Sequence, residues 1–153
     1  MKLTTKGRYA VSAMLDLACH TADGPASLAD IAKRQEISLS YLEQLFAKLR
    51  RGGLVRSVRG PGGGYLLSDS PAAISVADII RAVDESIRTT SCDANGDNGQ
   101  GCVRSSRCIA HHLWVELGER IHDYLASVSL DGLAKGYQKG RGLRERGSLG
   151  LPG

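Results

Sequence analysis

The fold is decided by residues 27–67, which read SLADIAKRQEISLSYLEQLFAKLRRGGLVRSVRGPGGGYLL. Ser27 is suited to cap a short helix, which a break at 36–38 ends. A second helix is predicted to follow at once, with Ser40 and Glu43 forming an S-x-x-E capping box. Apolar residues recur every three or four positions in both helices, and glycines end the second. Two short helices joined by a tight turn are typical of a helix-turn-helix.

A β-hairpin is predicted to follow the second helix. The β-rich stretch 54–59 leads into the glycine-rich stretch 60–64, and Tyr65-Leu66-Leu67 forms the return strand. A helix-turn-helix followed by such a hairpin is a winged helix, whose second helix enters the DNA major groove. An ordinary helical hairpin in a core is the alternative for the two helices taken alone. The glycines do not form a nucleotide-binding loop, because no Gly-Lys-Ser/Thr follows and they lead into a strand.

Helical periodicity also appears on both sides of this motif. It runs from Tyr9 to Ala18, and a further helix begins at a second capping box formed by Ser75 and Asp78. A long apolar stripe follows near the C-terminus. It is predicted to form a dimer interface, since winged helices commonly read two half-sites by two-fold symmetry, with packing on its own domain as the alternative. The residues of this interface are Trp114, Leu117, Ile121, Tyr124, Leu125 and Val128. The predicted fold class is mostly α with a small β-hairpin wing: a winged helix-turn-helix domain plus a long dimerisation helix.

The composition excludes several classes of protein. The 153 residues carry a formal charge of +4, with 42% apolar and 24% charged residues, which permits a core and excludes a wholly disordered chain. No apolar run approaches the roughly 20 residues of a membrane span, and the N-terminus lacks an apolar signal core. We therefore expect a cytoplasmic protein without a membrane partner. In a reducing compartment, three clustered cysteines suit a metal site better than disulfides, while Cys19 is predicted to be a core thiol.

The positive charge is concentrated in the N-terminal part of the chain. Residues 1–66 contain ten Lys and Arg against five Asp and Glu, a net charge of +5, which leaves −1 for the remainder. This asymmetry suggests a polyanion as partner, with a solvated basic surface as the alternative. Base-edge contacts are predicted for Tyr41, Glu43 and Gln44, near the start of the second helix of the motif. Phosphate or shape contacts are predicted for Arg8, Lys48, Arg50, Arg51, Arg56 and Arg59, and the predicted DNA-binding set also includes Ser38, Ser40 and Gly60.

A second candidate site lies in and just after a polar stretch rich in Gly, Asn and Asp. Cys92, Cys102, Cys108 and His111 follow one another as Cys-x9-Cys-x5-Cys-x2-His. The ligand count suits zinc, but no short Cys-x2–4-Cys pair occurs, and the spacing favours neither zinc nor an iron–sulfur cluster. Cysteines without a ligand role are a further alternative. His112 is a weaker candidate ligand than His111, because in a helix its side chain points about 100° away from that of His111.

Several motifs occur in a fixed order along residues 1–135. They are KGRYAVSAMLDLA (6–18), ISLSYLEQLFAKLRRGGLV (37–55), SVRGPGGGYLL (57–67), AVDES (82–86), and Cys108-x2-His111 followed by Leu113-Trp114. In this order they resemble the IscR-type family, which are homodimeric winged-helix transcription factors of bacteria that bind an iron–sulfur cluster. One departure is the separation of Cys92 and Cys102, which is longer than is usual in the family. An insertion at 93–101 is thermodynamically mild.

The resemblance implies a [2Fe-2S] cluster held by Cys92, Cys102, Cys108 and His111. It implies promoter DNA, a second copy of the chain and cluster-donating iron–sulfur assembly proteins as partners. Cluster occupancy would then report iron–sulfur supply. The form with cluster would repress assembly genes and activate some promoters, and some promoters would also be bound by the form without cluster. The chain would then divide into a winged helix-turn-helix domain (1–84), a cluster-binding loop (85–111), a dimerisation helix with a short terminal helix (112–135) and a flexible tail (136–153).

Two alternatives to this function stay open. A nitric-oxide-sensing branch of the family uses a [4Fe-4S] cluster with an acidic N-terminal residue, whereas the corresponding stretch here reads Gly7-Arg8-Tyr9. A zinc-stabilised DNA-binding or interaction domain is the alternative from another class. An enzyme is not expected, because no nucleophile, base and orienting group stand together and the four histidines lie on predicted helices without an evident partner.

Overall fold

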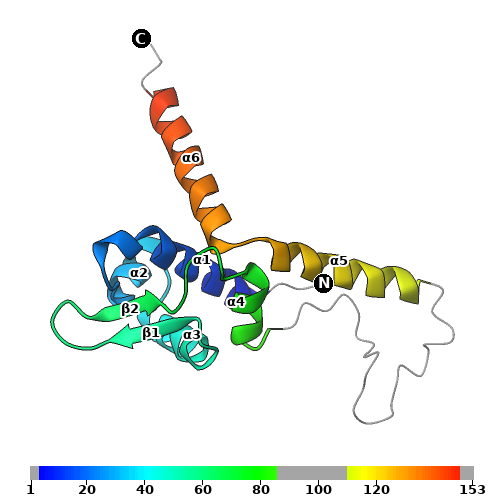
Figure 1. The fold of residues 1–153 in the computed structure, drawn as a ribbon, viewed down its shortest axis with the longest axis horizontal. Coiled ribbons are helices and arrows are strands. Elements are labelled where there is room, and N and C mark those ends of the chain that lie inside the picture. The colour runs from blue at the N-terminus through cyan, green and yellow to red at the C-terminus, as the bar shows by residue number, and fades with distance from the viewer. Residues whose placement is uncertain (1–3, 86–109, 149–153) are drawn as a thin grey trace.

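The computed structural model describes residues 4–85 and 110–148, apart from the side chains of 21, 111 and 141–148. In chain order its elements are α1 (Thr5–Cys19), the short 3-10 helix η1 (Thr21–Asp23), α2 (Leu28–Gln35), α3 (Leu39–Arg51), β1 (Val55–Val58), β2 (Gly64–Leu67), α4 (Val76–Ala82), α5 (His111–Ser127) and α6 (Leu130–Ser148). Helices α1 to α4 and the hairpin form one body, from which α5 and α6 extend in different directions (Figure 1). None of these helices combines the length and apolar character needed to cross a bilayer. The predicted mostly helical fold with one β-hairpin is confirmed.

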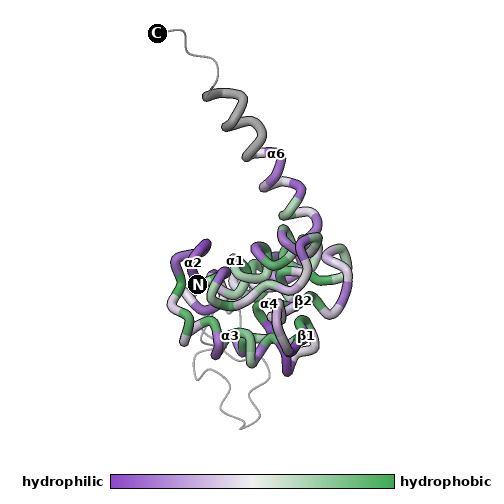
Figure 2. Tube along the Cα trace, turned by 90° about the vertical axis from the view of Figure 1, so that its left-hand side faces the viewer, coloured by the Kyte–Doolittle hydropathy of each residue, from purple (hydrophilic) through white to green (hydrophobic). Residues whose placement is uncertain are grey.

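One apolar core holds the four helices of the body together. Met14 and Leu17 of α1, Ile31 of α2, Phe46 of α3 and Ile79 of α4 are all fully buried in it. Each such side chain contributes about 1.5–3 kcal/mol on burial. Hydrophobic residues accordingly gather where the helices of the body meet, while the described part of α6 is largely hydrophilic (Figure 2). Because its apolar stripe is buried, α3 keeps its polar face toward solvent.

Two of the predicted helix starts are confirmed by their hydrogen bonds. Oγ of Ser27 caps α2 by accepting from the backbone N–H of Asp30 at 3.1 Å. At the start of α4, Oγ of Ser75 accepts from the backbone N–H of Asp78, and the Asp78 carboxylate accepts from the backbone N–H of Ser75, both at 3.1 Å. These reciprocal bonds form the predicted capping box, which satisfies two backbone donors that the helix itself leaves unpaired.

The predicted start of α3 is wrong by two residues. Ser38 is the cap, since its Oγ accepts from the backbone N–H three residues further on at 3.3 Å, while Ser40 already lies inside the helix. Ser40 and Glu43 therefore form no capping box. The choice between the two serines follows from packing. With Ser38 as cap, Ile37 and Leu42 occupy the positions of a hydrophobic staple, and both are buried in the core.

The hairpin is tight, and it is attached to the segment that precedes α2. Its strands are antiparallel, with Val55 opposite Leu67, and Gly60 at the tip has a left-handed φ of 100°. The backbone N–H of Tyr65 donates to the carbonyl of Ala26 at 2.8 Å, and the reverse bond between the same residues measures 3.0 Å. These two bonds fix the wing relative to the helix-turn-helix.

The predicted flexible tail at 136–153 is wrong as far as residue 148: α6 continues as a helix to Ser148, so the terminal helix is not short, and 149–153 lie outside the described residues. The first turn of α6 is held in place, because Leu130 is fully buried and its backbone N–H donates to the carbonyl of Ile74 at 3.0 Å. An ion pair of 2.7 Å between Lys135 and Asp131 adds support one turn further on. The Gly-Arg-Gly stretch and the few apolar residues of 136–153 favoured a tail, but each helical glycine costs only about 1 kcal/mol.

Candidate nucleic-acid interface

The outward face of α3 carries residues predicted to read bases. Ser40, Glu43 and Gln44 are exposed, while the apolar residues on the opposite face are buried. Because Ser38 supplies the helix cap, the carboxylate of Glu43 is not engaged there. It is available to accept from an amino group on a base edge. The first two turns of α3 thus present a polar surface of the kind that recognition helices use.

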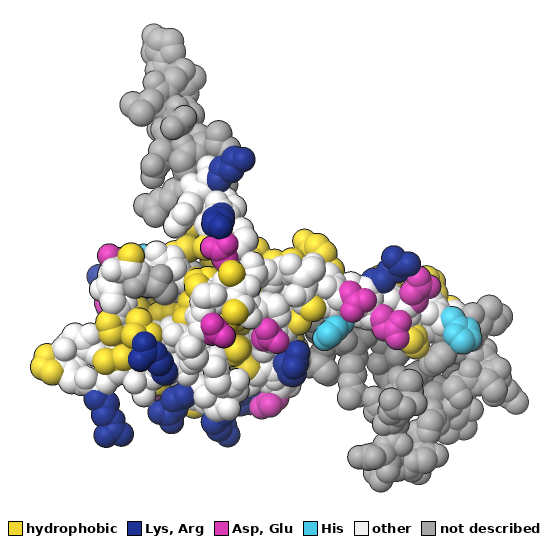
Figure 3. Space-filling model, in the orientation of Figure 1, with side chains coloured by type: hydrophobic (Ala, Val, Ile, Leu, Met, Phe, Trp, Pro, Cys, Tyr) yellow, Lys and Arg dark blue, Asp and Glu magenta, His cyan; other side chains and the backbone are white. Residues whose placement is uncertain are grey.

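Basic side chains border this surface. In Figure 3 the Lys and Arg side chains gather along the lower edge of the body, over α3 and the hairpin. Arg59 is exposed beside the glycine-rich tip of the wing, where little side-chain bulk separates the backbone from a ligand. The exposed members of the predicted set outside the first turns of α3 are Arg8, Arg50, Arg51, Arg56, Arg59 and Gly60.

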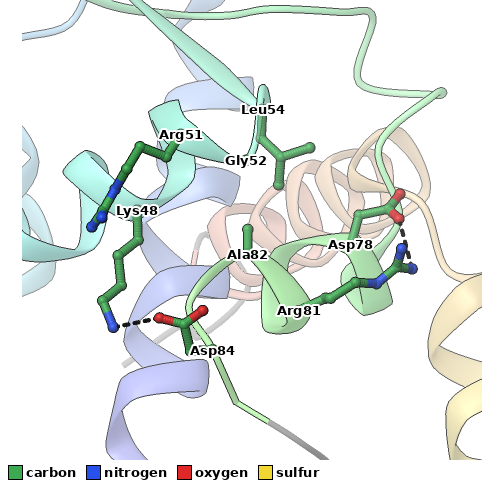
Figure 4. Close-up of a pocket in the computed structure, with 8 residues that line it drawn as sticks. All are labelled: Lys48, Arg51, Gly52, Leu54, Asp78, Arg81, Ala82 and Asp84. Atoms are coloured by element: carbon green, nitrogen blue, oxygen red, sulfur yellow. Dashed lines mark hydrogen bonds and ion pairs between the residues drawn. The ribbon is translucent and has the colours of Figure 1, made fainter.

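Lys48 differs from these groups because it is paired within the protein. Its Nζ lies 2.8 Å from Oδ2 of Asp84, beside an open cavity of about 420 Å³ between α3 and α4 that Arg51 and Arg81 also line (Figure 4). The hydrogen bond and charge of Asp84 raise the pKa of Lys48, and Lys48 lowers the pKa of Asp84. A phosphate at this place has to compete with Asp84 for the ammonium group.

A buried carboxylate fixes α2 against α1. The side chain of Asp16 is 2% exposed and accepts from Nε and Nη2 of Arg34, at distances from 2.6 to 3.1 Å, and from Nε2 of Gln35 at 2.8 Å. Burial raises the pKa of Asp16, but the hydrogen bonds and the charge of Arg34 outweigh it and hold this pKa below 3.8. Since α2 is the first helix of the motif, these hydrogen bonds between Asp16, Arg34 and Gln35 position the motif on α1.

Cys19 lies in the last turn of α1, near Asp16 and its partners. The sequence predicts a buried core thiol there, but the side chain is only half-buried. Burial and the nearby Asp16 carboxylate raise the pKa of the thiol, which keeps it protonated at neutral pH.

The predicted cluster ligands fall largely outside the described residues. Cys92, Cys102 and Cys108 lie within 86–109, and His111 is the first residue of α5, with its side chain outside the description. In the part of the chain that the structure describes, no group of three or more His, Cys, Asp and Glu side chains is arranged to hold a metal ion. The ligand set therefore stays a prediction.

Helix α5 presents large apolar side chains to solvent. Leu113, Trp114, Leu117 and Tyr124 are between 37% and 67% exposed. The remaining residues of the predicted stripe are half-buried: Ile121, Leu125 and Val128. An apolar face of this extent on an extended helix is typical of a protein-interaction surface.

Comparison with known proteins adds to this geometry. A family model described as Rrf2, iron-dependent transcriptional regulator, matches residues 3–136. The chain belongs to the Rrf2 family. It is 62% identical over 133 residues to a putative HTH-type transcriptional regulator, ORF2, of Azotobacter vinelandii, an alignment covering 87% of this chain and 79% of that protein. It is 57% identical over 135 residues to the HTH-type transcriptional regulator IscR of Xenorhabdus nematophila, covering 88% and 80% of the two chains.

Solved structures of Rrf2 regulators have the same architecture. The global cysteine regulator CymR of B. subtilis superposes with a TM-score of 0.72 at 36% identity, over 88% of this chain and 97% of that one. IscR of T. potens gives a TM-score of 0.72 at 38% identity, over 92% and 90% of the two chains. The predicted winged helix and the resemblance to IscR-type regulators are both confirmed. The chain is a DNA-binding transcriptional regulator of the Rrf2 family, and it is not an enzyme.

Proposed function

We propose that the chain regulates transcription in response to iron–sulfur status, with Cys92, Cys102, Cys108 and His111 holding a [2Fe-2S] cluster. Three thiolates and an imidazole are a chemically suitable donor set for such a cluster. The family description as iron-dependent supports an iron-containing group over zinc. The choice of [2Fe-2S] over [4Fe-4S] rests on the resemblance of the sequence motifs to IscR-type regulators and on Gly7-Arg8-Tyr9, which lacks the acidic residue of the nitric-oxide-sensing branch. The cluster assembles only when iron and sulfide are available, so its presence on the protein reports that supply.

One observation carries the DNA-binding part of the proposal. The first two turns of α3 carry an exposed polar face, and Lys and Arg side chains gather over α3 and the hairpin (Figure 3). Tyr41, Glu43 and Gln44 are the proposed base-reading residues, since residues at the start of a recognition helix reach base edges. The surrounding arginines, including Arg59 at the wing tip, hold the phosphates or the minor groove.

The proposed assembly is a homodimer formed through α5. A second copy fits the exposed stripe of α5, because an isologous pair buries the same apolar residues on both helices. Such a pair also presents two α3 helices to two DNA half-sites, as winged-helix regulators require. The proposed place of action is the cytoplasm. There the loaded form represses iron–sulfur assembly genes and activates some promoters, with assembly proteins as cluster donors.

Two carboxylates support a link between the proposed ligands and the DNA-binding helices. Asp84 and Glu85 are the last described residues before the segment with the cysteines. Asp84 binds Lys48 of α3, and Oε1 of Glu85 accepts from the backbone N–H of Thr4, at the start of α1, at 2.6 Å. If cluster binding restrains the segment with the cysteines, that restraint acts directly on Asp84 and Glu85, which contact α3 and the start of α1. Ligand binding coupled to local ordering is a general property of metal sites built from loops.

Anaerobic reconstitution with iron and sulfide tests the proposed function. The expected result is a protein with the visible absorption of an iron–sulfur cluster, which Cys102→Ala and His111→Ala lose. Cys19→Ala is the matched control, because Cys19 lies on α1 and is not a proposed ligand, and it keeps the absorption of the wild type. Light scattering on the same samples is expected to give twice the 16.3 kDa mass of one chain.

Three results would contradict parts of this proposal. A colourless protein with one zinc per chain would replace the cluster by a structural zinc site. Four irons per chain would identify a [4Fe-4S] cluster instead. Equal affinity of the apo and loaded forms for every duplex, measured at a fixed salt concentration, would show that the cluster does not control DNA binding.

Replacement of Arg59 tests the wing. Arg59→Ala is expected to weaken DNA binding and to reduce the slope of log K against log salt by about 0.9 for each phosphate that the protein no longer neutralises. The measurement is a titration of one duplex at several salt concentrations. Arg120→Ala is the control, since Arg120 is exposed on α5 and paired with Glu116 at 2.8 Å. An unchanged slope in Arg59→Ala would rule out a direct contact.

A further inference from the structure

An aromatic pair connects α1 to the first turn of α3. The rings of Tyr9 and Tyr41 have their centroids 5.9 Å apart and an interplanar angle of 83°, an edge-to-face arrangement. Tyr9 is 39% exposed, whereas Tyr41 is half-buried and packs against the core. This geometry is favourable for aromatic rings, because the positive edge of one ring meets the negative face of the other.

Tyr41 occupies a position where a small change of orientation matters. It is the third residue of α3, and its backbone N–H donates to Oγ of Ser38 at 3.3 Å. Exposed Ser40 and Gln44 lie beside it in the first two turns of the helix. The serine cap fixes the backbone of Tyr41 but leaves its side-chain torsions to the neighbouring groups. On one side, that neighbour is the ring of Tyr9.

Tyr9 is itself held on a well-anchored helix. The residues that follow it on α1, Ala10 and Ala13, are fully buried. Further along, Asp16 ties α1 to α2 through Arg34. The helix that carries the Tyr9 ring is therefore held in place by the apolar core and by the first helix of the motif. A ring placed in this way restricts the rotation of Tyr41 before DNA is bound.

We propose that Tyr9 is a positioning residue for DNA recognition: through the edge-to-face contact it orients Tyr41 at the DNA-facing start of α3, and so contributes to sequence preference from outside the helix-turn-helix. This inference rests on the proposed base-reading role of Tyr41. An aromatic pair of this kind corresponds to about a two- to ten-fold change in an equilibrium constant. The contribution is specific to the preferred duplex, since phosphate contacts do not depend on Tyr41.

The experiment starts from a preferred duplex, selected by the wild-type protein from a random pool of sequences. Affinities for this duplex and for an unrelated duplex of equal length are measured at one salt concentration for wild type, Tyr9→Phe, Tyr9→Leu, Tyr41→Leu and the double variant Tyr9→Leu/Tyr41→Leu. Tyr137→Leu, on exposed α6, is the matched control for loss of a surface tyrosine. Thermal unfolding of each variant separates recognition from folding.

Tyr9→Leu is expected to lower the ratio of preferred to unrelated affinity about five-fold, with the unrelated affinity within about two-fold of wild type. Tyr9→Phe keeps the ring and is expected to keep the ratio, as is Tyr137→Leu. In the Tyr41→Leu background, Tyr9→Leu should have no further effect on the ratio. A wild-type ratio in Tyr9→Leu, an equal loss on both duplexes, or an undiminished effect without Tyr41 would each overturn the positioning role. A wild-type protein that prefers no duplex would instead overturn the proposed function, and the positioning role with it.

Discussion

Arg34→Ala is expected to lower the free energy of unfolding at pH 7 by about 2–3 kcal/mol, although Arg34 lies outside the apolar core. The guanidinium is the main partner of Asp16, whose side chain is 2% exposed. Without it, a carboxylate stays buried with Gln35 and the more distant His20 as its remaining partners. The effect is smaller than for a fully buried pair, because the Arg34 side chain is 35% exposed and partly screened by solvent.

The sign of the pH dependence distinguishes this mechanism from general loss of packing. In the wild type the pKa of Asp16 is held below 3.8, so its contribution is present above the unfolded-state value and is lost as the pH falls through the lower folded-state value. In Arg34→Ala the burial that raises this pKa remains, while its main opposing cause is gone. The variant is then stabilised by protonation of Asp16. The difference in unfolding free energy between the two proteins is therefore expected to shrink on acidification.

Urea unfolding at pH 7 and at pH values stepped down toward 3.8 measures this difference. Lys33→Ala is the matched control, since it removes the exposed cation next in sequence and is expected to change stability by no more than about 0.5 kcal/mol. A stability loss in Arg34→Ala that is constant over this pH range would show that the ion pair with Asp16 is not its cause.

Local patterns were sufficient to predict most of the fold. The capping box of Ser75 and Asp78 and the glycine-rich wing are encoded within a few residues, and both occur as predicted. The start of α3 could not be settled in this way, because Ser38 and Ser40 both suit a cap and the choice depends on burial of Ile37. A short terminal helix was predicted, but the length of α6 was not, and its anchor Leu130 acts through contacts with residues far away in the sequence.

The candidate site could be predicted to a similar extent. Helical spacing was enough to place Glu43 and Gln44 on the exposed face of α3. It could not indicate that Lys48 is paired with Asp84, 36 positions later, or that Tyr41 meets the ring of Tyr9. Such pairs form where segments far apart in the sequence pack together, and a single periodic pattern carries no information about that packing. The proposed ligands Cys92, Cys102 and Cys108 lie outside the described residues, so their assignment rests on the sequence and the family.

Gly64→Ala is expected to destabilise the protein by about 2–3 kcal/mol and to weaken DNA binding, through one added methyl group. A Cβ at this position would lie well inside contact distance of the carbonyl oxygen of Ala26 and 2.9 Å from the backbone nitrogen of Ser27. These are backbone atoms, which cannot turn aside as a flexible side chain can. The same segment holds the wing through the paired backbone bonds of Tyr65 and Ala26, so relief of the clash requires these bonds to lengthen or break.

Gly136→Ala is the matched control for this change, because it adds the same methyl group on α6 where a Cβ meets nothing within 4 Å. Removing a helical glycine is expected to raise stability by about 0.5–1 kcal/mol. Thermal unfolding and titration of one duplex, done on both variants, compare the two sites. The order matters more than either value: if Gly64→Ala is as stable as Gly136→Ala, the wing is not fixed by its close approach to Ala26. If Gly64→Ala is destabilised but binds DNA normally, the wing keeps its function without its backbone attachment to Ala26. The contribution of Arg59 to DNA binding then cannot depend on that attachment.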